Sequence, residues 1–331
     1  MKKLTLTIII PTYNGSGWIE ACIKSILTQS FQDYTIIISD DCSSDDTVDL
    51  IRKIKDNRII IHQNKKNVGY AKNLQILKKY VKGDILFLMG QDDILLRDGL
   101  LKTYSVFLKD ESVGVVTRPY YWFDGKIKKP VRIILPYDPK HDRIISITDG
   151  KREVQKIFES VGQLSGLAFR MKYMQTNFND ETFPSHIYPF AEITKKYKVV
   201  YLHDYTIAVR IESSQTRFKS SIYDLSPTLS WVKMFKSVYH ENKYKRIRDA
   251  GIEQMATNFV GLVQLKNFST FKNLLREIYI MVTLRPLNLI DPRFWFFTLG
   301  TIIVPRIILI WLVDNYKRTI IAGQIAHQIH A

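Results

Sequence analysis

Two adjacent carboxylates, Asp92 and Asp93, follow a run of large apolar residues in the stretch DILFLMGQDDILL (84–96). The apolar run predicts a buried strand, so the two carboxylates lie at its carboxyl end. At an effective dielectric constant of 20, two like charges about 4 Å apart repel by about 4 kcal/mol. A positive partner is therefore expected, and Mg²⁺ or Mn²⁺ bound jointly with a diphosphate fits this chemistry. The alternative is a solvated turn that caps the next helix.

Similar polar residues follow two other predicted strands, at 4–10 and 34–39. The three strand ends carry, in order, Pro11, Thr12, Tyr13 and Asn14, then Asp40 and Asp41, then Gln91, Asp92 and Asp93. In an open parallel sheet, ligands bind outside the carboxyl ends of the strands. The ring of Tyr13 offers a flat face for a nucleobase, and Asp41 can accept from the imide N–H of a uracil or from ribose hydroxyls. The alternative role of Asp41 is a cap for the helix that follows it.

The elements that must position these residues alternate between apolar strands and amphipathic helices. Strands are predicted at 4–10, 34–39, 58–62, 84–89 and 113–117, and helices at 18–30, 45–55, 70–81 and 95–108. Strands that are apolar throughout and separated by helices indicate an α/β fold whose parallel sheet is covered on both faces. After Thr117 the pattern loosens, and a hairpin is expected to turn at Asp124–Gly125. Residues 227–284 have a helical, basic and aromatic pattern.

Three segments carry a resemblance to a known family: IIIPTYNGSGWIEACIKSILTQSFQDYTIIISDDCSSDDT, NKKNVGYAKNLQI and FLMGQDDIL. They resemble the nucleotide-sugar half of the family 2 glycosyltransferases, which have the GT-A fold, over roughly residues 4–110. The resemblance implies inverting transfer of a sugar from a nucleotide donor, usually with a divalent metal. It divides the chain into a nucleotide-sugar-binding half (1–117), an acceptor-binding half (118–215) and a basic helical C-terminal region (216–331).

The resemblance also assigns roles by position. The residues that would bind the nucleotide sugar are Pro11, Thr12, Tyr13, Asn14, Asp40, Asp41, Asn67, Gly69, Gln91, Asp92 and Arg210. Asp92 would contact the sugar. Asp93 would be the main ligand of the metal, Mn²⁺ or Mg²⁺, because Gly90 replaces the first acid of the family's Asp-x-Asp-Asp pattern. Arg210 lies where the family often carries an arginine near the donor phosphates; a plain surface charge is the alternative.

The group that removes the proton from the acceptor hydroxyl is the second departure from the family pattern. The family usually supplies an acidic pair just before the helix that precedes a strand like KVVYL (198–202), and here that pair falls on Ser185 and His186. His186 is chemically able to serve, since the unperturbed pKa of histidine is about 6.5. Three nearby acids remain alternatives, and so does a structural role for His186. The three acids are Asp180, Glu181 and Glu192.

The C-terminal third combines positive charge with a long apolar stretch. The 331 residues include 48 Lys and Arg against 32 Asp and Glu, a formal net charge of +16, and most of the excess lies after residue 110. This balance favours an anionic partner. Residues 294–313 are apolar except for Arg306 beside Pro305. Segments that lie in a membrane interface are expected, with a single span or a buried soluble helix as alternatives. The expected setting is the cytoplasmic face of the plasma membrane, near a lipid-linked saccharide acceptor.

Other classes of protein fit the sequence less well. Two cysteines exclude a disulfide framework. A dehydrogenase would use the glycines of GSGWIE (15–20), but Glu20 occupies the place of the third glycine. No nucleic-acid-binding motif accompanies the positive charge, so no nucleic-acid partner is expected. The remaining alternative is a non-catalytic assembly partner of the same fold. The predicted function is sugar transfer from a UDP-sugar to a saccharide in capsule or O-antigen biosynthesis.

Overall fold

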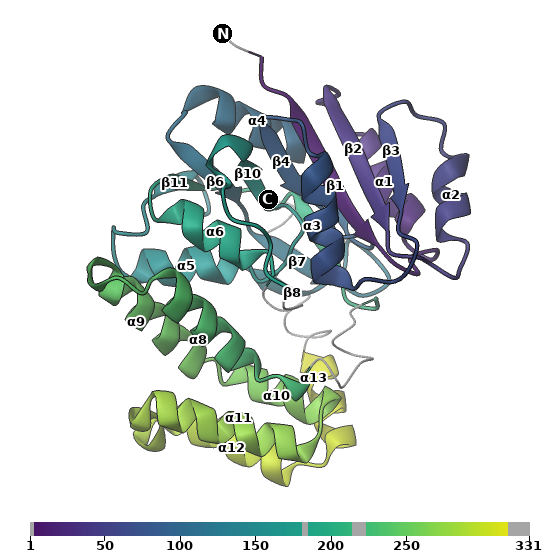
Figure 1. Cartoon of the computed structure of the whole chain (residues 1–331). Helices are drawn as coiled ribbons and strands as arrows, with labels where there is room; N and C mark the ends of the chain where they lie inside the picture. The colour runs from purple at the N-terminus through teal and green to yellow at the C-terminus, as the bar shows by residue number, and fades with distance from the viewer. Residues whose placement is uncertain (1–2, 181–184, 214–222, 317–331) are drawn as a thin grey trace.

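The computed structural model describes residues 3–180, 185–213 and 223–316, and its centre is an eight-stranded sheet with the order β3-β2-β1-β4-β10-β6-β11-β9 (Figure 1). The strands of this sheet are β1 (Leu6–Thr12), β2 (Tyr34–Asp40), β3 (Ile59–Gln63), β4 (Ile85–Leu88), β6 (Val113–Thr117), β9 (Arg143–Ile145), β10 (Ala168–Arg170) and β11 (Lys198–Tyr201). The surrounding helices include α1 (Ile19–Leu27), α2 (Thr47–Lys53), α3 (Tyr70–Tyr80), α4 (Gly99–Lys109), α5 (Lys151–Ser160) and α6 (Ile187–Thr194). The predicted α/β architecture is confirmed.

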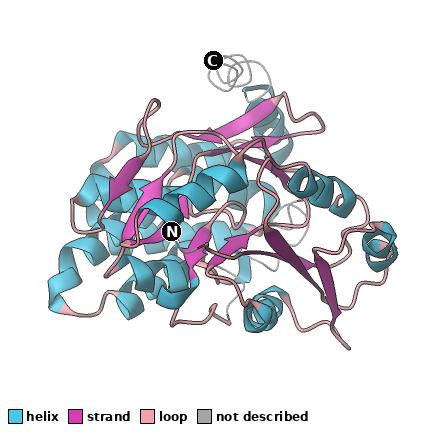
Figure 2. Cartoon of the chain, turned by 90° about the horizontal axis from the view of Figure 1, so that it is seen from above, coloured by secondary structure: helices cyan, strands magenta, loops and turns pink. Residues whose placement is uncertain are grey.

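The first half of the sheet is parallel, as predicted, because β1 pairs parallel with β2 and β4, and β2 pairs parallel with β3. Alternate residues of β1 enter two different hydrophobic cores. Ile8 and Ile10 pack with α1, whereas Ile9 packs on the opposite face with Leu74 and Leu77 of α3. Helices therefore cover both faces of the strands, as the view from above also shows (Figure 2). This double burial explains why the strands are apolar at every position.

One strand departs from the parallel arrangement in a way that matters for the site. β10 lies between β4 and β6 and is antiparallel to both. The chain enters this gap from the carboxyl edge of the sheet, where Gly166 donates to the carbonyl of Leu88 at 2.9 Å and Leu88 donates to the carbonyl of Leu167 at 2.9 Å. The entry brings Ser165 to the end of β4. The sheet is consequently mixed rather than wholly parallel.

A second sheet lies beside the same edge, with the order β5-β12-β7-β8. Its strands are β5 (Ile94–Leu95), β7 (Tyr120–Phe123), β8 (Pro130–Ile134) and β12 (Ile207–Arg210). β7 and β8 form the predicted antiparallel hairpin. β5 begins directly after Asp93 and pairs antiparallel with β12, with Ala208 opposite Ile94. This register places Arg210 beside the two carboxylates.

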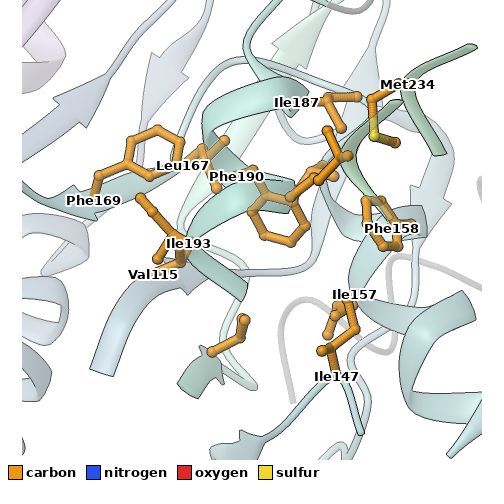
Figure 3. Close-up of a cluster of buried hydrophobic side chains, with 14 of the residues drawn as sticks. Val115, Ile147, Ile157, Phe158, Leu167, Phe169, Ile187, Phe190, Ile193 and Met234 are labelled. Carbon is orange, nitrogen blue, oxygen red and sulfur yellow. The ribbon is translucent and has the colours of Figure 1, made fainter. Parts of the chain in front are cut away.

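A cluster of aromatic rings joins the sheet to the first helices of the C-terminal third (Figure 3). Phe158 of α5 lies at its centre, with ring centroids 5.4 Å from Phe190 and 4.7 Å from Phe235. These rings are buried together with residues of α8 (Pro227–Val238) and α9 (Lys245–Ala256). α8 and α9 therefore share the core of the sheet, although the sequence places them in a separate C-terminal region.

The last helices form a smaller unit at the opposite end of the molecule from the N-terminus (Figure 1). They are α10 (Val260–Phe268), α11 (Phe271–Leu284), the 3₁₀ turn η4 (Pro286–Ile290), α12 (Pro292–Ile303) and α13 (Arg306–Tyr316). The apolar stretch 294–313 is thus divided at Pro305 into two short helices. Within the described ranges, none of the helices has both the length and the apolar character needed to cross a bilayer.

Candidate active site

Asp92 and Asp93 lie at the carboxyl edge of the sheet, as the sequence predicts. The Asp93 side chain is 5% exposed; its Oδ1 accepts from the backbone N–H of Arg210 at 2.9 Å, and its Oδ2 accepts from the hydroxyl of Ser165. Oδ2 of Asp92 accepts from the hydroxyl of Ser213. Each carboxylate is therefore held by a donor from a distant part of the chain.

Oxygen atoms of both carboxylates converge above Gly90. A Cβ atom placed on Gly90 would lie 3.0 Å from Oδ2 of Asp93, 3.1 Å from Oδ1 of Asp92 and 3.2 Å from Oγ of Ser165. Ser165 also accepts from the N–H of Gly90 at 2.8 Å. A side chain at position 90 would push these oxygens apart, so the glycine keeps open a cradle lined by oxygen atoms.

The guanidinium of Arg210 lies beside this pair, which favours the predicted site role over a plain surface charge. Its Nε donates to the backbone carbonyl of Asp92 at 3.2 Å, and its Nη1 lies 3.3 Å from Oε2 of Glu212. The guanidinium carbon lies 4.5 Å from the ring centroid of Trp18 and 4.6 Å from that of Phe123. Two aromatic faces thus fix the cation where it can reach the carboxylate pair.

Burial makes the carboxylate pair difficult to ionise. Desolvation, together with the charge of Asp92, raises the pKa of Asp93 from 3.8 to about 8. Desolvation also raises the pKa of Asp92, although the Ser213 hydroxyl and the charge of Arg210 act in the opposite direction. The donors of the fold therefore offset the charge of an ionised pair only in part, and a bound cation would favour ionisation of both carboxylates.

The loop after β1 places Tyr13 at the surface of this edge. The Tyr13 side chain is 36% exposed, and the amide of Gln91 accepts from its backbone N–H and donates to its carbonyl, both at 3.0 Å. The Gln91 side chain thus holds the Tyr13 backbone in place, and the tyrosine ring remains available to stack on a ligand. Pro11 and Thr12 are buried at the end of β1, where Thr12 is in register with Asp40.

Two further residues of the predicted nucleotide-sugar set tie neighbouring loops together. Oδ1 of Asn14 accepts from the N–H of Ser44 at 2.9 Å. Asp40 is fully buried and accepts from both the N–H and the hydroxyl of Ser43. These side chains shape the loops that follow β1 and β2 rather than pointing free polar groups at a ligand.

Asp41 has a similar positioning task. Its Oδ1 accepts from Asn64 at 2.9 Å and from the N–H of Val68 at 2.8 Å, while Oδ2 accepts from the N–H of Gly69 at 2.8 Å. Gly69 begins α3 with a φ of +87°, a conformation that favours glycine. Asp41 therefore anchors the start of α3 rather than the helix that directly follows it, and exposed Asn67 lies in the loop so fixed.

His186 lies just before α6 and is 5% exposed. Its Nε2 lies 3.0 Å from the carbonyl of Val161; because a carbonyl can only accept, Nε2 carries the proton. Nδ1 is then a buried acceptor with no hydrogen-bond partner among the described residues. Burial lowers the pKa of His186 to about 4, so the ring is neutral at physiological pH.

The three alternative bases have different surroundings. Asp180 is exposed and accepts from Gln75 at 2.9 Å. Glu192 on α6 forms an ion pair with Lys195 at 2.9 Å. Glu181 lies outside the described residues. Among the described residues, no hydrogen bond or ion pair places any of these carboxylates, or His186, beside Asp92 or Asp93, so the geometry does not choose among the candidate bases.

Several site residues have no signal in the sequence. Ser165 and Ser213 are ordinary serines in loops, and they reach the carboxylates only through the paths of β10 and β12. Tyr70, at the start of α3, lies near enough that the charges of Asp92 and Asp93 add to the burial that raises its pKa. Trp18 could have been noticed as an aromatic residue directly before a helix, but nothing in the sequence links it to Arg210.

The donor set of the cradle suits a hard divalent cation. Its oxygens are carboxylate and hydroxyl groups, and hard oxygen ligands are the ones that Mg²⁺ and Mn²⁺ prefer. Within the described ranges, no group of three or more His, Cys, Asp and Glu side chains is gathered as a metal site. Asp92 and Asp93 would therefore hold an ion only together with oxygens from a ligand such as a diphosphate.

A mixed α/β sheet with polar residues gathered at its carboxyl edge is the arrangement expected of the GT-A fold. The family model described as Glycosyl transferase family 2 matches residues 7–175, just over half of the chain, from β1 to beyond β10. The chain belongs to glycosyl transferase family 2.

Individual relatives agree with this assignment. The chain is 41% identical over 116 residues to the UDP-Glc:alpha-D-GlcNAc-diphosphoundecaprenol beta-1,3-glucosyltransferase WfaP of Escherichia coli, covering 35% of this chain and 46% of WfaP. It is 29% identical over 123 residues to the glycosyltransferase GlyG of Streptococcus pneumoniae, covering 36% of this chain and 40% of GlyG. The chain thus spans less than half the length of these two relatives. An uncharacterized glycosyltransferase of Haemophilus influenzae is 24% identical over 72% of this chain and 94% of its own length.

Solved structures share the fold at low identity. S. aureus TarS in complex with UDP aligns with a TM-score of 0.61 at 15% identity, covering 95% of this chain and 89% of that one. The mannosyltransferase PcManGT of Pyrobaculum calidifontis, in complex with GDP-Man and Mn²⁺, aligns with a TM-score of 0.56 at 15% identity over 96% of this chain and 88% of its own.

Asp93→Asn tests whether the carboxylate pair is strained by burial. A pKa raised from 3.8 to about 8 means that ionised Asp93 destabilises the folded chain increasingly as pH rises through this range. Without added metal and with a chelator present, we expect Asp93→Asn to exceed the wild type in free energy of unfolding at pH 8 by about 1 kcal/mol or more. The advantage should vanish near pH 4. Urea unfolding from pH 4 to 8 measures it.

The matched control for that experiment is Asp49→Asn, which changes an exposed carboxylate of α2 whose side chain is 72% exposed. Its stability should follow the wild type across the same pH range. An Asp93→Asn variant that is less stable than the wild type at pH 8 would show that the carboxylate is well compensated within the fold.

Proposed function

We propose that the chain is an inverting glycosyltransferase that moves a sugar from a nucleotide diphosphate donor to a hydroxyl of a saccharide acceptor. The observation that carries the proposal is the convergence of Asp92, Asp93 and Ser165 oxygens above Gly90, at the carboxyl edge of a parallel sheet. A diphosphate bound with a cation at this edge would supply the positive charge and oxygen ligands that the pair lacks. Family membership supports the same reaction class.

We propose a UDP-sugar as the donor and a lipid-linked saccharide as the acceptor. Support comes from the name of WfaP, which specifies UDP-Glc and GlcNAc-diphosphoundecaprenol and whose matching segment is 41% identical. The exposed ring of Tyr13 offers a stacking face for the uracil, and Asp41 fixes the loop around Asn67 against which the nucleoside would lie. Such a reaction belongs to the biosynthesis of capsule or O-antigen polysaccharide.

The carboxylate pair and Arg210 would act on the donor. Asp93 and Asp92 would hold a divalent ion, which would stabilise the negative charge that develops on the departing diphosphate. The guanidinium of Arg210, fixed between Trp18 and Phe123, adds a permanent positive charge at the same place. Asp92, whose Oδ1 lines the cradle, would orient the sugar hydroxyls.

His186 would accept the proton of the attacking hydroxyl. Its Nε2 is occupied by the carbonyl of Val161, so Nδ1 is the basic atom, and the lowered pKa keeps it unprotonated at neutral pH. As the acceptor oxygen attacks the anomeric carbon, the bond to the nucleoside diphosphate breaks and the hydroxyl proton passes to Nδ1. One displacement of this kind inverts the anomeric centre.

The proposed setting is the cytoplasmic face of the plasma membrane. Cys22 and Cys42 are both free thiols, and Cys42 is exposed, which suits a reducing compartment. A lipid-linked acceptor would be presented at that surface.

Asp93→Asn tests the proposed reaction directly. The amide preserves the shape of the side chain but removes the charge on which cation and diphosphate binding depends. With Mn²⁺ present, turnover of UDP-sugars, followed as UDP release, should fall about 100-fold or more, whereas Asp49→Asn should keep wild-type turnover. Wild-type rates in Asp93→Asn would contradict the role of the pair.

His186→Gln tests the proposed base. Glutamine can still donate to the carbonyl of Val161 but cannot accept a proton at neutral pH. We expect kcat for transfer to fall about 10²–10⁴-fold, with KM for the donor and the melting temperature close to wild type. Full activity in a folded His186→Gln variant would assign His186 a structural role and return the base to Asp180, Glu181 or Glu192.

A further inference from the structure

The outer surface of α12 reverses the usual pattern of a surface helix. Phe294, Thr298 and Thr301 face inward and are at most 4% exposed, whereas Phe296 is 74% exposed and Ile303 is 71% exposed. A helix on a soluble surface normally presents polar residues to water. Here two polar threonines are buried beside Phe294, and two other large apolar side chains, Phe296 and Ile303, lie outside.

The apolar surface continues into the neighbouring elements. Ile290 of η4 is 78% exposed, and Ile307 and Trp311 of α13 are 83% and 63% exposed. We call these residues, with Phe296, Leu299 and Ile303, the docking surface. These exposed side chains lie on three elements that follow one another in the chain, and large exposed apolar patches mark sites that bind proteins or membranes.

We propose that the docking surface binds the surface of an anionic phospholipid bilayer, with α12 and α13 lying in the plane of the interface. α12 has 12 residues and is about 18 Å long, well short of the roughly 30 Å hydrocarbon core. The break at Pro305 leaves two short helices in place of one long apolar helix. Helices of this kind insert their apolar face at the boundary of headgroups and acyl chains.

The charges around the surface favour an anionic lipid over a second copy of this chain. Residues 257–313 contain six basic and only two acidic side chains. Of the two acids, Glu277 is buried and accepts from the N–H of Thr228, and Asp291 forms an ion pair with Arg293 at 2.9 Å. Exposed Lys272 and Arg306 would meet lipid phosphates. A second copy would instead bring like charges together.

An indole adds a further feature of membrane interfaces. Trp295 of α12 donates its Nε1 hydrogen to the carbonyl of Leu289 at 2.7 Å, and its side chain remains 41% exposed. Tryptophan is enriched at the level of lipid headgroups, where one part of the ring is apolar and the other is polar.

The position of the surface suits the proposed reaction. β1 runs from the N-terminus toward the side of the molecule on which α10 to α13 lie, so the carboxyl edge of the sheet and the helices that carry the docking surface are on the same side (Figure 1). The membrane proposal depends on the proposed function in one respect only: membrane binding would give the enzyme access to a lipid-linked acceptor. Vesicle binding is measured without donor or acceptor, so the two proposals can fail separately.

Flotation with vesicles of phosphatidylglycerol and phosphatidylcholine tests the proposal on the full chain. The variant replaces four residues by serine: Phe296, Ile303, Ile307 and Trp311. The matched control replaces four apolar residues that are exposed elsewhere on the molecule by serine: Ile60, Leu101, Leu135 and Ile144. We expect the first variant to bind mixed vesicles at least about tenfold more weakly than wild type, and the control to bind like wild type.

A second variant, Lys272→Gln with Arg306→Gln, separates charge from apolar contact. It should bind anionic vesicles about tenfold more weakly and pure phosphatidylcholine vesicles as the wild type does. Circular dichroism and urea unfolding verify that each variant is folded. Equal flotation of the wild type and the folded serine variant would overturn the proposal, and so would a stable dimer that vesicles do not dissociate.

Discussion

The repulsion between Asp92 and Asp93 is the constraint on which the rest of the site depends. The two carboxylates are adjacent in the chain, and burial raises both of their pKa values. The hydroxyls of Ser165 and Ser213 donate to the two carboxylates, and the guanidinium of Arg210 lies beside them. These groups hold the pair in place but offset the charge of the ionised carboxylates only in part, so a bound cation would complete the site and would let it accept the proposed diphosphate.

The order of strands in the two sheets brings the partners of Asp92 and Asp93 to this edge. β10 enters between β4 and β6 from the carboxyl side and so delivers Ser165, while β12 pairs with β5 and so delivers Arg210. At the ends of β1, β2 and β4, four side chains hold loops in place: Asn14, Asp40, Asp41 and Gln91. The Tyr13 ring and the loop of Asn67 are the parts of this edge that the proposed donor would meet, and a rigid edge would position that donor with little reorganisation.

The strands, the helices and the carboxylates could be predicted from the sequence because their signals are local: apolar runs, helical spacing, and polar residues directly after strands. The antiparallel direction of β10 could not be predicted, because a strand of only three residues carries no sequence signal of its direction. Ser165 is 72 positions from Asp93, and only the completed sheet joins them. Asp41 shows the same limit, since its type suggested a ligand contact while the path of residues 64–69 makes it an anchor for α3. The division of the apolar stretch 294–313 into two helices could be predicted, because Pro305 is a helix breaker.

The most direct test of the central claim is a crystal structure of the chain with UDP and Mn²⁺, with anomalous diffraction recorded to locate the manganese. The account predicts one manganese peak beside the oxygens of Asp93 and Asp92 above Gly90, shared with the diphosphate of UDP. A nucleotide bound at this edge with no metal peak, or a manganese ion bound elsewhere, would contradict the claim that the adjacent carboxylates serve to hold a cation against the donor.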